Sequence, residues 1–322
     1  MSESAPLISI IVNTYNGARY LPECLDSILA LEGNYPLQII VVDDASQDDT
    51  PTVLSRYQDE RIEFIQLQHN RGAAEAVNTA FAAVRAPYTA RIDYDDRYRP
   101  HFLLRAMQAL ESNPKAGLVC GGVEMIDPAG APTGLSSPLQ QGYEAGCSDH
   151  FLNLLLHYFV TAPTLLARTE IWKRAIPLPK GMNFGDWYMT LKMAEVSELC
   201  IIDDTLADYR IHPLNMHSTM VMDGSGERTT WRVLDHFTGA SPRADEIRGV
   251  RSEIYARHAA DWGDRYFGAH MHRDARRCYL KALGTAPRQH FRAELLWRLI
   301  GTLLGMQRYE WLKQKIRSAV RS

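Results

Sequence analysis

Short apolar runs alternate with segments of helical periodicity over the first 125 residues. Leu7–Val12 and Leu37–Val42 are almost wholly apolar, whereas Ala18–Ala30 spaces its apolar side chains three and four residues apart. Strands that are apolar on both faces and separated by helices are typical of a parallel sheet covered on both sides. We therefore predict an α/β fold with a Rossmann-like, mostly parallel sheet flanked by helices.

Polar residues stand where the predicted strands end. They fall in four segments: Asn13–Asn16, Asp43–Ser46, His69–Gly72 and Asp93–Asp96. In sheets of this kind ligands bind at the carboxyl ends of the strands, so the four segments should converge on one crevice. For Asp43 or Asp44 taken singly, the alternative is a cap of the following helix, a common role of aspartate.

Three carboxylates lie within four residues in the segment Asp93-Tyr94-Asp95-Asp96. Like charges at this spacing repel one another and lose hydration if the site closes, and a divalent cation removes that cost. Mg²⁺ and Mn²⁺ prefer oxygen ligands, usually one or two carboxylates together with substrate phosphates. The segment therefore predicts a metal that holds a phosphorylated ligand. A solvated acidic turn is the alternative for this segment taken alone.

Composition bears on partners and location. The chain has 322 residues and a net charge of −3, so no basic field favours nucleic-acid binding. Its five cysteines are scattered without a CxxC pair, which predicts reduced thiols and neither a zinc site nor a disulfide framework. The first residues do not resemble a signal peptide, and no apolar run is long enough to span a membrane. We therefore predict a cytoplasmic protein.

Several segments together resemble the family-two inverting glycosyltransferases, which have the GT-A fold. These segments are Ser9–Asn16, Ile40–Asp48, Asn70–Asn78 and the acidic tetrad, which is similar to the DXD motif of that family. Ala45 stands where glycine is usual, and Tyr94 where alanine is usual. The resemblance is strong over residues 6–125 and thinner to about residue 220. It implies transfer of a sugar from a nucleotide sugar, most often a UDP-sugar, with Mn²⁺ or Mg²⁺ as cofactor.

The resemblance assigns five residues to the nucleotide. Asp44 would accept a hydrogen bond from the base, and Tyr15 would stack on that base. Asn13 and Arg71 would help to hold the base or a phosphate. Asp93 would contact the ribose or a water molecule bound to the metal.

The resemblance also assigns residues to the metal. Asp95 would ligate the ion, with Asp96 nearby, and bulky Tyr94 would alter the packing around the sugar or ribose. The stretch from residue 209 to residue 218 is similar to the Y-R-x-H…N-x-S segment of the family. In that stretch His212 would complete the metal or diphosphate site, with His217 as the less favoured choice. A purely structural histidine is the other possibility.

The second half of the chain supplies the chemistry that the resemblance implies. Gly181–Tyr188 resembles the family segment that ends in E-D-W, and Asp186 matches the catalytic aspartate, with Trp187 as a possible further site residue. An acceptor hydroxyl is a poor nucleophile until a carboxylate takes its proton. For inversion, this base and the metal have to lie on opposite faces of the anomeric carbon. The alternative for Asp186 is an N-cap of the following helix.

The pattern predicts two parts in the chain. Residues 1–228 would form the GT-A domain, with a nucleotide-binding half at 6–125 and an acceptor and catalytic half at 126–228, which opens with a long loop over 127–150. Residues 229–322 would form a helical extension with one tetratricopeptide-like repeat near 255–287. The basic amphipathic tail from residue 307 is suited to peripheral contact with a membrane, although packing on the repeat is favoured. The helices could also join copies of the chain.

We therefore predict an inverting glycosyltransferase that moves a sugar from a nucleotide sugar to a hydroxyl of a glycan, lipid-linked or other acceptor, as in polysaccharide biosynthesis. Two alternatives stay open. A nucleotidyltransferase would need a basic, glycine-rich phosphate loop after the first strand, and Asn13–Gly17 does not provide one. A catalytically silent nucleotide-sugar-binding module with a helical interaction tail would have no use for Asp93, Asp95 and Asp186 together.

Overall fold

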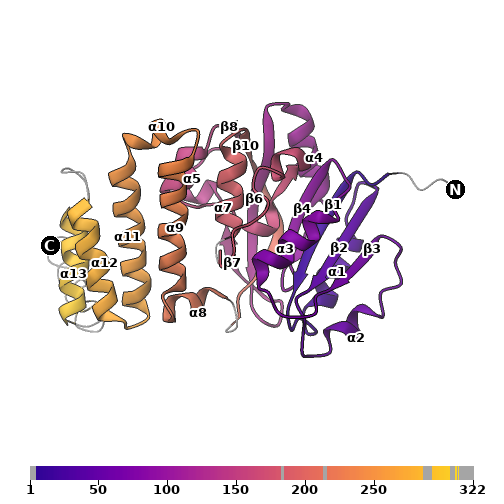
Figure 1. Cartoon of the computed structure of the whole chain (residues 1–322), viewed down its shortest axis with the longest axis horizontal. Helices are drawn as coiled ribbons and strands as arrows, with labels where there is room; N and C mark the ends of the chain where they lie inside the picture. The colour runs from indigo at the N-terminus through magenta and orange to yellow at the C-terminus, as the bar shows by residue number, and fades with distance from the viewer. Residues whose placement is uncertain are drawn as a thin grey trace. The chain divides into compact units, whose positions relative to one another are not determined.

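The computed structural model describes residues 5–182, 185–212, 216–285, 292–304, 309 and 311. The chain divides into two compact units, Met1–Pro213 and Leu214–Ser322. The sequence pattern placed the boundary later, after residue 228, which lies in the first turn of helix α9 (Ser225–Ala240). Figure 1 shows a sheet with helices in the first unit and helices in the second.

Four parallel strands form the first half of the sheet in the first unit. Their spatial order is β3-β2-β1-β4, and the three inner strands are buried almost throughout, as the apolar runs predict. The strands are β1 (Ile8–Thr14), β2 (Leu37–Asp43), β3 (Ile62–Gln66) and β4 (Tyr88–Asp93). The helices of this half are α1 (Leu21–Leu29), α2 (Thr50–Leu54), α3 (Ala73–Ala82) and α4 (Phe102–Ser112).

The second half of the sheet is mixed. Beyond β4 the order is β9-β6-β10-β5, with β9 antiparallel to both of its neighbours and β6 parallel to β10. These strands are β5 (Arg97–Tyr98), β6 (Ala116–Ile126), β9 (Leu166–Arg168) and β10 (Glu198–Arg210), and the helices are α5 (Phe151–Leu156), α6 (Thr169–Trp172) and α7 (Gly185–Ala194). The prediction of a mostly parallel sheet flanked by helices is therefore confirmed.

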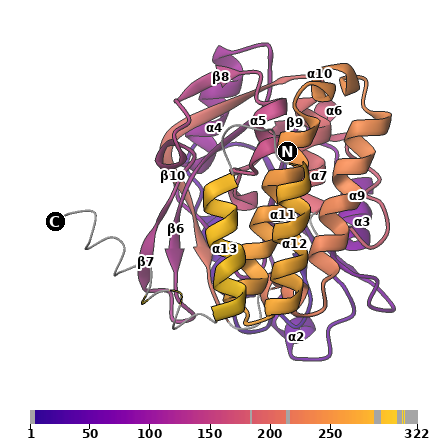
Figure 2. The same ribbon diagram turned by 90° about the vertical axis from the view of Figure 1, so that its left-hand side faces the viewer.

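The stretch that was expected to be one long loop, residues 127–150, contains two short strands. β7 (Pro132–Ser136) returns antiparallel to β6, which forms the hairpin visible in Figure 2, and β8 (Gly146–Ser148) pairs with β10. The stretch is rich in glycine, proline and serine, so its strands carry little of the apolar alternation by which strands are recognised.

The expectation that all five cysteines are reduced is wrong for two of them. Cys147 on β8 and Cys200 on β10 form a disulfide, whereas Cys24, Cys120 and Cys278 are free and buried. The two bonded residues stand directly opposite each other in the antiparallel pair β8–β10. Cysteines opposite each other in neighbouring strands can be 53 residues apart in the sequence, and spacing alone gives no sign of such a pair.

The disulfide predicts the number of reactive thiols. In protein that is purified and denatured without reductant, we expect three reactive thiols per chain, and five after reduction. Cys147→Ser is a matched control, because it frees Cys200 and should raise the unreduced count to four. Five reactive thiols in the unreduced wild-type chain would contradict the pairing.

The second unit is helical in the residues that the structure describes. Its helices are α8 (Met216–Met222), α9, α10 (Ala244–Arg248), α11 (Arg251–Gly268), α12 (His272–Thr285) and α13 (Arg292–Leu304). Figure 1 shows α11 and α12 side by side, and Gly263 permits their close approach: a Cβ atom there would lie 2.4 Å from the Tyr279 ring. Small residues at such a contact fit the predicted helical repeat. Pro287, which would end the repeat, lies outside the described residues.

A buried carboxylate joins α9, α11 and α12. Glu227 accepts hydrogen bonds from Arg277 at 2.8 and 2.5 Å, from Trp231 Nε1 at 3.0 Å and from Tyr266 Oη at 2.9 Å. Burial opposes the charge on Glu227, but these hydrogen bonds outweigh it and lower its pKa to about 2. The carboxylate is therefore ionised at neutral pH and holds the three helices together.

Glu227→Gln should destabilise the helical unit by about 2 kcal/mol, because it removes a charge-assisted partner and leaves buried donors poorly satisfied. Since the pKa of Glu227 is lower in the folded chain, its contribution is complete above the unfolded pKa and is lost as pH falls toward 2. Chemical denaturation at pH 7 measures the change. Glu253→Gln, which breaks an exposed pair with Arg257 at 3.7 Å, should cost about 0.5 kcal/mol or less. Equal effects in the two variants would contradict this role.

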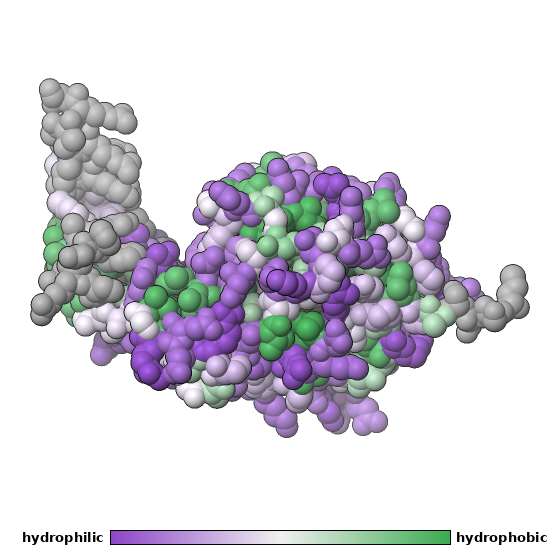
Figure 3. All heavy atoms as spheres, turned by 90° about the horizontal axis from the view of Figure 1, so that it is seen from above, coloured by the Kyte–Doolittle hydropathy of each residue, from purple (hydrophilic) through white to green (hydrophobic). Residues whose placement is uncertain are grey.

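Hydrophilic residues cover much of the described surface in the view of Figure 3, with smaller apolar patches between them. Across the described ranges, no helix has both the length and the apolar character needed to cross a bilayer. Of the basic tail from residue 307, only residues 309 and 311 are described. The predicted membrane contact of that tail therefore lies outside the described residues.

Candidate active site

The carboxyl ends of β1, β2 and β4 lie side by side. In the parallel register Asn13 stands opposite Asp93 and Thr14 opposite Asp43, so the polar segments predicted to converge begin at one edge of the sheet. The strands end together because their apolar runs have matched lengths and each run gives way to polar residues. The convergence predicted from the sequence is thus present in the first unit.

The loops that follow β1 and β2 are tied to each other. Asn16 N donates to Ser46 Oγ at 2.8 Å, and Gly17 N donates to Thr50 Oγ1 at 2.9 Å. Ala45 has a φ of 62°, in the left-handed region that glycine favours. Glycine suits this position because the φ angle is positive. Ala45 adopts that same backbone conformation.

Asp44 fixes the loop before α3. Its two carboxylate oxygens each accept a backbone hydrogen bond at 2.7 Å, one from Arg71 N and the other from Gly72 N. Arg71 extends outward with its side chain 59% exposed and lies 3.5 Å from Glu75, and Tyr15 is also exposed. Both side chains are therefore accessible to a ligand, whereas Asp44 is buried and already accepts two hydrogen bonds.

A buried arginine that the sequence analysis missed stands behind the edge. Arg91 Nε donates to Asn13 Oδ1 at 3.0 Å, Arg91 also pairs with Asp93 at 2.5 Å, and Asn13 Nδ2 donates to Asp93 Oδ1 at 3.0 Å. Burial opposes the charge on Arg91, but the charges of Asp93 and Asp186 outweigh it and raise its pKa. The signal in the sequence was a cation inside an otherwise apolar strand, which is costly unless it is paired.

The acidic tetrad meets the end of β10. His212 Nε2 lies 2.9 Å from Asp95 Oδ2, and both side chains are largely buried. Burial and the charge of Asp93 raise the pKa of Asp95, against the opposing effect of His212. Burial, together with the charges of Asp95 and Asp93, raises the pKa of Asp96 well above its ordinary value.

The donor set fits a divalent ion that is also held by a ligand. Among the described residues, no group of three or more His, Cys, Asp or Glu side chains could hold a metal by itself. Mg²⁺-type ions usually take only one or two protein ligands beside substrate phosphates, and adjacent ligands of an octahedral ion lie about 3 Å apart. The distance of 2.9 Å between Asp95 and His212 matches that spacing. Asp96 Oδ2 is buried without a hydrogen-bond partner in the described part of the chain.

Tyr94 packs over the loop that follows β1. A Cβ atom at Gly17 would lie 2.7 Å from the Tyr94 ring, so the ring occupies the space that glycine leaves. The loop that follows β1 therefore accommodates this large residue. Burial raises the pKa of Tyr94, followed by the charges of Asp95 and Asp93, and its hydroxyl stays protonated at neutral pH.

Asp186 stands in the first turn of α7, near the cluster on β4. Its charge acts on Arg91, on Tyr158 and on Tyr209, and the charges of the tetrad act on Tyr209 as well. Asp186 therefore acts electrostatically on Arg91 and Tyr209, two residues on which the tetrad also acts. Trp187, named as a possible site residue, is buried and donates through Nε1 to the carbonyl of Leu154 at 2.9 Å, so it anchors α7. The side chain of His217 lies outside the described residues.

Comparison with known proteins gives a family match over part of the chain. Residues 9–158 match the family model described as glycosyl transferase family 2. The chain is 28% identical over 225 residues to an uncharacterized glycosyltransferase of Nostoc sp., with 65% of this chain and 66% of that protein covered. It is 34% identical over 110 residues to the succinoglycan biosynthesis protein ExoO of Rhizobium meliloti, with 34% of this chain and 31% of that protein covered. The chain thus spans less than two thirds of either relative.

Solved structures show the same fold. Staphylococcus aureus TarS, in its fragment 1–349 with UDP-GlcNAc, matches with a TM-score of 0.55 and 16% identity, covering 97% of this chain and 92% of that one. The mannosyltransferase PcManGT from Pyrobaculum calidifontis, in complex with GDP-Man and Mn²⁺, matches with a TM-score of 0.61 and 18% identity. That match covers 97% of this chain and 84% of the other.

Proposed function

From the match of residues 9–158 to the model of glycosyl transferase family 2, we propose an inverting transfer of a sugar from a UDP-sugar to a hydroxyl of a glycan or lipid-linked acceptor. The observation that supports the proposal is the electrostatic effect of Asp186 on Arg91, which itself contacts Asn13 and Asp93. The proposed donor edge would thereby be coupled to a carboxylate from the second half of the chain.

The donor would lie on the edge formed by β1, β2 and β4. We assign Tyr15 to stacking on the base, Asn13 and Arg71 to the base or phosphates, and Asp93 to the ribose or a metal-bound water. Asp44 would reach the base with the lone pairs left free by its two backbone hydrogen bonds. TarS binds UDP-GlcNAc and PcManGT binds GDP-Man, which supports a nucleotide sugar as the donor class.

Asp95 and His212 would hold Mn²⁺ or Mg²⁺ together with the diphosphate, with Asp96 behind them. The ion, when bound, offsets the negative charge that builds on the departing diphosphate. The complex of PcManGT with Mn²⁺ supports this assignment. Asp95 and His212 would hold the ion in place, and Tyr94 packs against the loop that follows β1.

Asp186 would act as the general base. As the acceptor oxygen bonds to the anomeric carbon, the carboxylate takes the hydroxyl proton, and the bond from that carbon to the diphosphate oxygen breaks. Attack from the face opposite the leaving group inverts the anomeric centre. Arg91 and Asp186 interact electrostatically, which links the proposed base to the proposed donor edge.

The C-terminal helices would serve docking rather than sugar transfer. Among their described residues the one buried carboxylate cluster, at Glu227, is fully occupied by helix contacts. We propose contact with another copy of the chain or with the inner face of a membrane as their role. Contact with a membrane is proposed because the tail from residue 307 is basic.

A screen of nucleotide sugars by thermal shift tests the proposal. At 100 times its dissociation constant, a ligand stabilises the folded chain by about 2.7 kcal/mol, which should raise the melting temperature by several degrees. We expect a UDP-sugar to produce this shift with Mn²⁺ and a much smaller one with EDTA. No shift with any UDP- or GDP-sugar would contradict the proposed function.

A further inference from the structure

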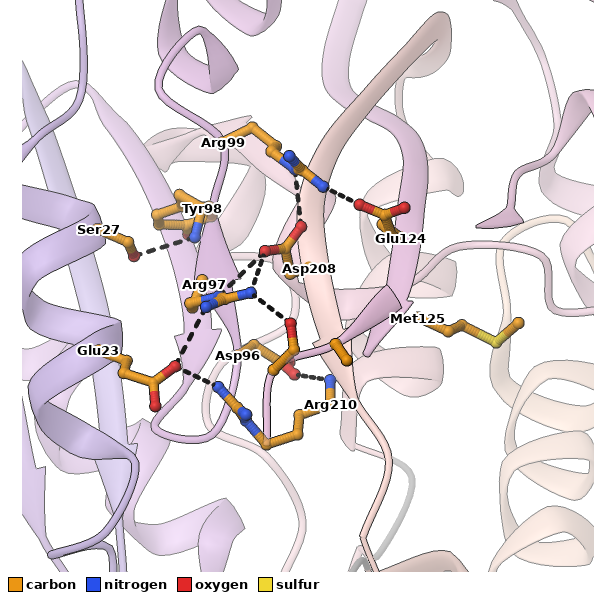
Figure 4. A network of polar contacts seen from close by, with 12 residues as sticks. Glu23, Ser27, Asp96, Arg97, Tyr98, Arg99, Glu124, Met125, Asp208 and Arg210 are labelled. Carbon is orange, nitrogen blue, oxygen red and sulfur yellow. Dashed lines mark hydrogen bonds and ion pairs between the residues drawn. The ribbon is translucent and has the colours of Figure 1, made fainter. Parts of the chain in front are cut away.

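A chain of alternating charges crosses the first unit from β6 to α1 (Figure 4). Glu124 on β6 pairs with Arg99, which lies 2.7 Å from Asp208 on β10, and Asp208 in turn lies 2.8 Å from Arg97 on β5. Arg97 lies 3.2 Å from Glu23 on α1. Arg210 also pairs with Glu23. With Arg210 included, the chain of charges contains three arginines and three carboxylates.

Arg210 ends this chain beneath the tetrad. Its guanidinium is fully buried, lies 2.6 Å from Glu23 and donates through Nε to the carbonyl of Asp95 at 2.9 Å. Its backbone N–H donates to Asp96 Oδ1 at 2.9 Å, and the guanidinium stacks 4.5 Å from the centre of the Tyr20 ring. One side chain thus links the main chain of the tetrad to helix α1.

Glu23 is the carboxylate that forms an ion pair with the buried guanidinium of Arg210. A buried guanidinium is costly when it is unpaired, and it seeks another carboxylate when its partner is removed. Arg210 already touches the main chain of Asp95 and, through its backbone N–H, the carboxylate of Asp96. It also lies beside the carboxylate of Asp127. An arginine released from Glu23 would therefore compete for the side chains that a cation needs.

We propose that Glu23 is a positioning residue for the metal site: it keeps Arg210 on the main-chain carbonyl of Asp95 and away from the carboxylates of Asp95 and Asp96. This inference rests on the proposed function, because it presumes that the tetrad binds a divalent ion. Glu23 itself would touch neither the ion nor the nucleotide. Its carboxylate is 44% exposed, so it can be changed without opening a cavity in the core.

The test measures Mn²⁺ affinity directly, by the electron paramagnetic resonance signal of free Mn²⁺ in titrations with UDP present. For Glu23→Gln we expect the apparent dissociation constant for Mn²⁺ to rise about 10-fold or more, the usual effect of losing an outer-shell partner. At saturating Mn²⁺, kcat should return nearly to the wild-type value. A change in metal affinity with kcat retained is not expected from a residue that only stabilises the fold.

Glu124→Gln is the matched control, because Glu124 pairs with an arginine of the same charge chain but lies at the far end from Asp95. Its Mn²⁺ affinity should stay within about twofold of wild type. Equal weakening in the two variants, or wild-type affinity in folded Glu23→Gln, would overturn the inference. If Glu23→Gln does not fold, Arg210→Lys takes its place, because lysine cannot contact both Glu23 and the Asp95 carbonyl. Arg210→Lys should also weaken Mn²⁺ binding. Wild-type Mn²⁺ affinity in this variant would overturn the inference.

The same titration separates this inference from the proposed function. A wild-type chain that binds no Mn²⁺ in the presence of UDP would overturn the proposed metal site and the inference with it. A wild-type chain that binds Mn²⁺ normally, beside an unchanged Glu23→Gln, would overturn the inference alone.

Discussion

Asp95→Asn is expected to leave the fold intact and to lower the turnover of the nucleotide sugar on the order of 10²-fold or more at ordinary Mn²⁺ concentrations. The residue sits 2.9 Å from His212, and burial and the charge of Asp93 raise its pKa. A nearby cation stabilises a buried carboxylate, and the loss of one metal ligand removes several kcal/mol of charge stabilisation in the transition state. Steady-state rates at several Mn²⁺ concentrations give the size of the loss.

The matched control is Asp59→Asn, which removes a carboxylate that pairs with Arg61 on the surface of the same unit. Its turnover should equal that of the wild type. Full activity of Asp95→Asn, or full activity of the wild type in excess EDTA, would overturn the metal assignment.

Asp186→Asn should lower kcat on the order of 10²–10⁴, the usual contribution of general base catalysis, while donor affinity changes little. The amide is close in shape to the carboxylate and cannot take the proton of the acceptor hydroxyl. Rapid-quench measurement of the chemical step, beside a titration of the donor, separates the two effects.

Asp203→Asn serves as the control for the loss of one carboxylate, because Asp203 is exposed on β10. We expect its kcat to match the wild type. If Asp186→Asn lost donor affinity and kept the rate of the bound complex, the residue would belong to the donor side of the site and the assigned role would be wrong.

The sequence was sufficient to predict the strands in the parallel half of the sheet. Runs such as Leu37–Val42 are apolar because both faces of an inner strand are covered, and that burial is visible in composition. The strands of 127–150 were missed because a short edge strand needs few apolar side chains. The Cys147–Cys200 pair was missed because strand pairing, not sequence spacing, sets which cysteines meet.

The sequence predicted some residues of the candidate site and missed others, because contacts across the sheet leave no pattern in the sequence. The Asp95–His212 contact joins two residues that the family resemblance had already named. Arg91 and Glu23 were not named, because their importance lies in which charges they meet across the sheet. The two backbone hydrogen bonds to Asp44 were equally hidden, since main-chain donors leave no mark in a sequence.

We propose that one edge of this sheet binds a nucleotide together with a divalent ion. Calorimetric titration of UDP into the wild-type chain, once with Mn²⁺ and once with EDTA, measures both requirements in one experiment. We expect saturable binding of one UDP per chain with Mn²⁺, and affinity at least about 10-fold weaker with EDTA, the scale on which loss of a metal contact acts. Equal affinity in the two titrations would overturn the proposed metal site, and no UDP binding in either would overturn the proposed donor site.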